Sequence, residues 1–110
     1  MGTFVISEDL SGAYAFRLYG DQGEILLVSE PYAARGGCLN GAEAALYSAQ
    51  DEARYKRRIS PEGAHYFLLT ARNGKAICVS EHYESAAACE AGIAAVMRAA
   101  QGAGVYERLL

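Results

Sequence analysis

Residues 28–32 read Val-Ser-Glu-Pro-Tyr, and residues 79–83 read Val-Ser-Glu-His-Tyr. The two stretches lie 51 positions apart, and the same offset aligns further pairs of residues without a gap. These pairs are Gly12/Gly63, Phe16/Phe67, Leu18/Leu69, Gly23/Gly74, Cys38/Cys89, Gly41/Gly92 and Ala44/Ala95. Because self-similarity at a fixed period indicates a structural repeat, the chain is predicted to contain two copies of one unit.

Alternating side chains predict that each copy begins with strands. Between residues 14 and 19, Phe16 and Leu18 alternate with Arg17 and Tyr19, which is the period of a half-buried strand. In the strand that follows we expect alternate residues to face the core in both copies. These residues are Leu26 and Val28 in the first copy and Ile77 and Val79 in the second.

Turn and helix signals complete the unit. Asn73-Gly74 is a strong hairpin signal, and Asp21-Gln22-Gly23 occupies the matching position, so we expect antiparallel hairpins. Later in the second copy, apolar residues recur at helical spacing, and Ser85 is placed to cap the helix. The helical stripe consists of Cys89, Ile93, Val96, Met97 and Ala100, and the first copy repeats it in smaller residues.

The predicted fold class is therefore α+β, with two tandem β-β-β-α repeats and a C-terminal strand. We expect an antiparallel sheet with the helices packed on one face and a pseudo-twofold internal symmetry. The terminal strand is predicted because the same offset takes Phe4 to Tyr55 and Tyr55 to Tyr106. The predicted boundaries are 3–50 for repeat one, 54–101 for repeat two and 104–110 for the strand, within a single domain of residues 1–110.

Gly41 and Gly92 fall inside the two predicted helices. Glycine there costs about 0.5–1 kcal/mol relative to alanine. Because both copies carry the cost, we expect another backbone to approach closely at each glycine.

Charge is distributed unevenly along the chain. The 110 residues carry a net charge of −3 and are 52% apolar. Residues 1–53 hold two basic and eight acidic side chains, whereas residues 54–110 hold eight basic and five acidic ones. No apolar run is long enough to span a bilayer and no leader precedes the first copy, so a cytoplasmic protein without membrane association is predicted.

Both copies carry ordered motifs at matched spacing. The motifs are Phe16-Arg17-Leu18, Ser29-Glu30-Pro31-Tyr32, Cys38-Leu39-Asn40-Gly41, Tyr55-Lys56-Arg57-Arg58, Tyr66-Phe67-Leu68-Leu69, Asn73-Gly74, Ser80-Glu81-His82-Tyr83 and Gly92-Ile93. Together they resemble the motifs of the YegP-like proteins. The resemblance implies β-β-β-α-β repeats in which the strand after each helix joins the sheet. It also implies that single-copy relatives pair, so this chain is expected to be a monomer with an internal pseudo-dimer. The resemblance implies no biochemical activity for this chain. Its alanine-rich helices depart from the family pattern.

One repeated polar motif is a candidate ligand site. A hydroxyl, a carboxylate and a phenol together can orient a small polar molecule. The alternative, which we favour, is that serine and glutamate satisfy backbone groups where strand meets helix while tyrosine packs its ring. The residues are Ser29, Glu30 and Tyr32 in the first copy and Ser80, Glu81 and Tyr83 in the second.

A basic run in the second copy is a candidate nucleic-acid or anion site. Cations contact phosphates and aromatic rings stack on bases in proteins that bind single strands on a sheet. The favoured alternative is a strand whose charges are solvated or paired with acidic residues. The residues concerned are Arg54, Tyr55, Lys56, Arg57, Arg58 and Tyr66.

Cys38 and Cys89 near the helix starts support a second alternative, an enzyme or redox protein. Both fall on the apolar stripe, which favours inert core thiols, whereas Cys78 alternates away from Ile77 and Val79. No catalytic set, cofactor site or metal site is predicted. The sequence thus predicts a small module that is non-enzymatic and structural or binding, with an unidentified partner.

Overall fold

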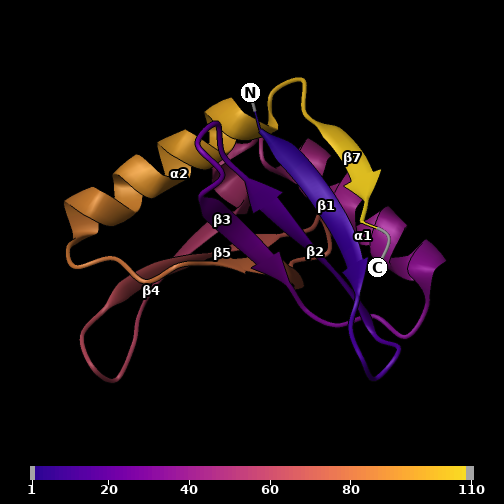
Figure 1. Ribbon diagram of the computed structural model, residues 1–110. Helices are drawn as coiled ribbons and strands as arrows, with labels where there is room; N and C mark the ends of the chain where they lie inside the picture. Colours follow the sequence, from indigo (N-terminus) through magenta and orange to yellow (C-terminus); the bar gives the residue numbers. More distant parts are fainter. Residues whose placement is uncertain (1, 109–110) are drawn as a thin grey trace.

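A computed structural model describes residues 2–108 (Figure 1). Its elements follow one another as two β-β-β-α units and a final strand, with a short 3₁₀ turn, η1, between the units. The elements of the first unit are β1 (Thr3–Glu8), β2 (Tyr14–Tyr19), β3 (Ile25–Ser29) and α1 (Arg35–Ser48). Those that follow are η1 (Glu52–Arg54), β4 (Tyr55–Ile59), β5 (His65–Thr70), β6 (Ala76–Ser80), α2 (Ala86–Ala100) and β7 (Gly104–Glu107).

All seven strands form one sheet in the order β4-β5-β6-β3-β2-β1-β7. The central neighbours β3 and β6 are antiparallel, and Val28 faces Val79, its own counterpart in the other copy. A pseudo-twofold axis therefore passes between these two valines. The predicted α+β class with tandem repeats, helices on one face and internal symmetry is confirmed.

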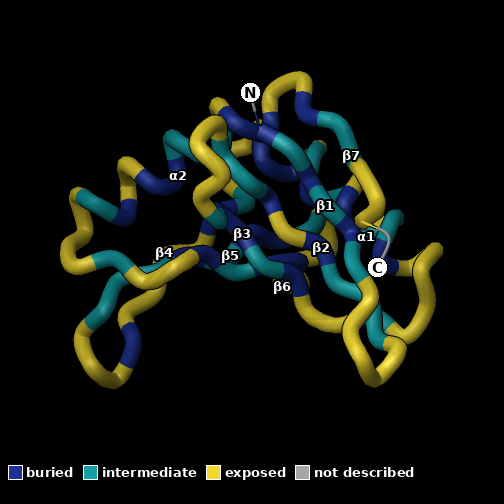
Figure 2. Tube along the Cα trace, viewed as in Figure 1, coloured by how far each residue is buried: buried dark blue, intermediate teal, exposed yellow. Residues whose placement is uncertain are grey.

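The core lies between the sheet and the two helices (Figure 2). Phe4, Phe16 and Phe67 are fully buried there. In α2, Ser85 accepts a hydrogen bond from the Ala88 N–H at 3.0 Å, which confirms the predicted cap. The glycine in the β5–β6 turn, Gly74, has φ of 84°, the conformation that its hairpin requires.

Each copy has a β-bulge in its third strand, and the bulge changes which of the residues predicted to face the core do so. Leu18 pairs with Leu27 and Tyr19 pairs with Ile25, so Leu26 is an extra residue in β3. Leu27 shares the buried face with Leu18, whereas Val28, like its counterpart in β6, is only half buried and lies on the face away from the helices. The expectation that Val28 and Val79 face the core was wrong, because the bulge resets the alternation.

The helix glycines also have a different neighbour from the one expected. A Cβ at Gly41 would lie 2.7 Å from Cζ of Tyr32, and one at Gly92 would lie 2.5 Å from Cζ of Tyr83. The close approach is real, but a tyrosine ring makes it and a neighbouring backbone does not. The tyrosine of each repeated polar motif thus packs against the glycine of the helix that follows.

The two edges of the sheet differ. At one edge, β7 runs parallel to β1, and the Arg108 N–H donates to the Ile6 carbonyl at 2.8 Å. Arg35 at the start of α1 reinforces this edge with an ion pair of 2.6 Å to Glu107. Within residues 2–108 nothing pairs with the outer side of β4. The last two residues of the predicted terminal strand, 109 and 110, lie outside the described part of the chain.

Candidate binding surface on the open face and the β4 edge

The sheet face opposite α1 and α2, here called the open face, has an apolar centre with a cation on each side. The registers place Lys56, Leu68, Val79, Val28 and Arg17 in one row across five neighbouring strands. The three apolar members are half buried, and the two cations are exposed. With strands about 4.8 Å apart, the cations stand about 19 Å from each other. Such a row can contact an extended anionic partner.

A second row adds aromatic groups at the β4 end. Arg58 faces Tyr66 across the β4–β5 pair. The Tyr66 ring stacks on His82, with centroids 5.1 Å apart and an angle of 26°. The sequence motifs indicated Tyr66 but gave no reason to choose His82, because the two residues belong to different segments and only the fold stacks them.

The residues of the basic run from Arg54 to Arg58 lie in different surroundings in the structure. Lys56 and Arg58 point to the open face, as their pairing with Leu68 and Tyr66 requires. Tyr55 is buried, and its hydroxyl donates to the Ala49 carbonyl at 2.7 Å. Burial raises the pKa of this phenol. Arg54 lies 3.4 Å from the carboxylate of Asp51, at the start of η1.

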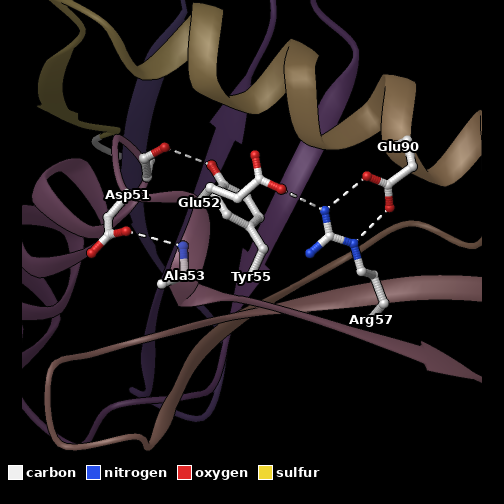
Figure 3. A network of polar contacts seen from close by, with 7 residues as sticks. Asp51, Glu52, Ala53, Tyr55, Arg57 and Glu90 are labelled. Atoms are coloured by element: carbon white, nitrogen blue, oxygen red, sulfur yellow. Dashed lines mark hydrogen bonds and ion pairs between the residues drawn. The ribbon is translucent and has the colours of Figure 1, made fainter.

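Arg57 is on the helix side, between two carboxylates (Figure 3). Its Nε and Nη2 donate to Glu90 at 2.6 and 2.7 Å, and Nη2 also donates to Glu52 at 3.0 Å. These hydrogen bonds raise the pKa of Arg57 and lower that of Glu90. Arg57 is therefore already neutralised by its own chain and offers little to an anion.

This ion pair stands where the first copy has two apolar residues. The 51-residue offset relates Arg57 to Ile6 and Glu90 to Leu39. Ile6 is buried at the edge that β7 covers, whereas Arg57 has 39% of its side chain exposed at the uncovered edge. The exchange matches the difference in solvation, since a charged pair suits an edge in water.

The repeated polar motif is engaged within the protein. Ser80 Oγ accepts from the Phe67 N–H at 3.0 Å and donates to the Glu81 carbonyl at 2.8 Å. Ser29 makes the equivalent pair of hydrogen bonds in the first copy. The Tyr83 ring stacks on Phe67 at 6.3 Å, and desolvation raises the pKa of its phenol. Tyr32 packs in the same way on Phe16. The side chains of Glu30 and Glu81 are exposed and do not join the buried serines in one site.

The three cysteines are free and buried. Desolvation raises the pKa of each thiol, most strongly that of Cys78, which lies on the helix side of β6. Thiolate chemistry at Cys38 or Cys89 would require both exposure and a lowered pKa. Within residues 2–108 no group of three potential metal ligands comes together, and no helix is long and apolar enough to cross a membrane.

Fold and surface together define a class of protein: a small tandem-repeat α+β module with one covered and one open sheet face. The family model described as a domain of unknown function, DUF1508, matches residues 9–55 and again residues 61–107. The chain belongs to this family.

Its relatives carry UPF0339 names. A UPF0339 protein from the 5′ region of the ptx operon in Stutzerimonas stutzeri is 40% identical over 106 residues, which cover 96% of each chain. The UPF0339 protein YegP of Yersinia pestis is 36% identical, over 89% of this chain and 88% of its own.

Two solved structures share the fold. The solution structure of yegP from E. coli, a protein of unknown function, superposes with a TM-score of 0.90 at 29% identity, over 97% of this chain and 92% of that one. A UPF0339 protein of Shewanella oneidensis gives a TM-score of 0.89 at 31% identity, over 96% and 90% of the two chains. These relatives confirm the predicted resemblance and agree with a small module whose function is unknown.

Proposed function

We propose that the protein is a non-enzymatic binding module whose open face holds an extended, acidic segment of a partner protein. The observation that carries the proposal is the row from Lys56 to Arg17, an apolar strip with a cation at either side that no element of residues 2–108 covers. An acidic segment laid across the strip would cover half-buried valines and pair its carboxylates with both cations. Burial of all three thiols supports the non-enzymatic character.

Reversing a positive charge at the β4 end of the open face, where Lys56 and Arg58 lie, tests the proposal. In a titration of the full chain with poly-glutamate, monitored by fluorescence anisotropy, we expect binding that weakens as salt is raised. Arg58→Glu should weaken binding at least tenfold. Arg98→Glu, which makes the same charge change in the last turn of α2, should leave it within about twofold, because α2 covers the other face. Equal losses in both variants would show non-specific attraction and contradict the proposal.

Single-stranded nucleic acid is the second candidate, and the Tyr66–His82 stack beside Arg58 favours it. Aromatic rings on a sheet can stack with bases while neighbouring cations contact phosphates. Oligothymidine titrated under the same conditions separates the candidates. Tighter binding of oligothymidine than of poly-glutamate, lost in Tyr66→Ala, would replace the leading proposal with this one.

We also infer that the chain acts as a monomer in a reducing, cytoplasmic compartment. The β3–β6 seam already joins the two copies within one chain, which supports the monomer. Three free cysteines support the compartment, since oxidising environments favour disulfides. Sedimentation of the purified chain tests the first inference.

A further inference from the structure

The outer side of β4 is equivalent to the strand position that β7 fills at the other edge. The repeat relates β4 to β1, and β1 is paired in parallel with β7. Ile6, whose carbonyl accepts from the Arg108 N–H, corresponds to Arg57 in β4. The fold thus shows, on one edge, how a parallel strand is held at a position that no described strand fills on the other (Figure 1).

The register fixes which backbone groups of β4 face this open edge. The Ser60 N–H donates to the Ala64 carbonyl at 2.8 Å, so these residues form a hydrogen-bonded pair. Hydrogen-bonded and non-hydrogen-bonded pairs alternate along two antiparallel strands. Arg57 and Ile59 therefore occupy non-hydrogen-bonded positions, and their N–H and C=O groups point away from β5. The Phe67 N–H agrees with this assignment, because it donates to a serine on β6 and not toward β4.

One of these outward groups already has a substitute partner. Arg58 Nη1 donates to the Arg57 carbonyl at 3.0 Å. This carbonyl is the counterpart of the one on Ile6 that β7 uses. Arg58 is exposed, so an incoming backbone N–H can take over the carbonyl and free the guanidinium for a carboxylate.

The charges of β4 select the occupant. Lys56 and Arg58 repel a second copy of the same edge, a device that protects edge strands from self-association. The same cations attract carboxylates on alternate residues of an incoming strand, which share their side of the sheet. We propose that the β4 edge accepts an extended acidic segment of a partner protein as an additional parallel strand. The inference rests on the proposed function and specifies how one end of its partner is held: the stretch that reaches β4 pairs with the strand edge beside Lys56 and Arg58, and the row toward Arg17 stays available to the rest of the segment.

The test uses the full chain and a labelled peptide that alternates glutamate with valine. We expect binding by fluorescence anisotropy, together with slower amide exchange at Arg57 and Ile59. Ile59→Pro removes one outward N–H and should weaken binding about tenfold or more. Ile59→Ala keeps that N–H and should bind as the parent does, since the Ile59 side chain is already 65% exposed.

A second measurement leaves the protein unaltered. The same peptide with methyl groups on alternate backbone nitrogens keeps its charges but cannot pair as a strand, so its binding should fall by at least tenfold. If Ile59→Pro and the methylated peptide bind as their parents do while Arg58→Glu abolishes binding, charge alone holds the peptide. That result overturns strand addition and leaves the proposed function standing. If the unmodified peptide does not bind, both fail.

Discussion

Replacing Gly92 with alanine should destabilise the protein, although alanine is the better helix former. A Cβ at this position would lie 2.5 Å from Cζ of Tyr83. Non-bonded carbon atoms approach to about 3.5 Å, so ring and helix must separate by about 1 Å. The ring cannot simply tilt away, because it is stacked on the fully buried Phe67 with an interplanar angle of 8°.

Two opposing terms set the size of the effect. Alanine gains up to about 1 kcal/mol in helix propensity, and overpacking a filled site costs about 1–3 kcal/mol. We expect a net loss of about 1–2 kcal/mol in the free energy of unfolding. For a chain of this size that lowers the melting temperature by roughly 4–8 °C.

Circular dichroism during thermal and urea unfolding gives both quantities. The matched control is Gly36→Ala, a glycine near the start of α1 whose added Cβ would meet no atom within 4 Å. This control should be neutral or stabilising. In a Tyr83→Phe background, loss of the hydroxyl removes part of the clash, so Gly92→Ala should cost less there. A Gly92→Ala protein as stable as the parent would refute the close approach of ring and helix.

Three further outcomes follow from contacts in the structure. Ser80→Ala leaves the buried Phe67 N–H without its acceptor and should lower the free energy of unfolding, measured in urea, by about 1–3 kcal/mol. A loss below about 0.5 kcal/mol would show that another acceptor replaces the serine. Glu90→Gln breaks a bidentate pair with Arg57 that is 39–52% exposed, so screening limits its cost to at most about 1 kcal/mol, and the cost should shrink at high salt. The three buried thiols should resist a thiol reagent until the protein unfolds. Since folding raises their pKa, their contribution to stability is present below the ordinary thiol pKa of about 8.5 and is lost as pH rises above it; unfolding free energies that stay constant through that range would contradict the shift.

The sequence alone determined the repeat and the elements within it. A fixed offset relates the copies, and alternation at Phe16 and Leu18 gave the β2 strand. Asn73-Gly74 marked a hairpin, and Ser85 marked the start of α2. These signals are local: propensity, period and turn geometry act between residues that are neighbours along the chain. The same locality made the glycines of the two helices noticeable, because their cost can be estimated from the helix alone.

The tertiary structure decided what each of those residues meets. Val28 faces away from the helices because of a bulge, and a bulge depends on the strand beside it. The run from Arg54 to Arg58 reads as one basic patch, yet strand alternation sends Arg58 to the open face and Arg57 to Glu90 on α2. The repeat also makes β1 and β4 look alike, while β7 covers only the first. Contacts between distant segments form only when the chain folds. These contacts make the β1 edge, which β7 covers, different from the β4 edge.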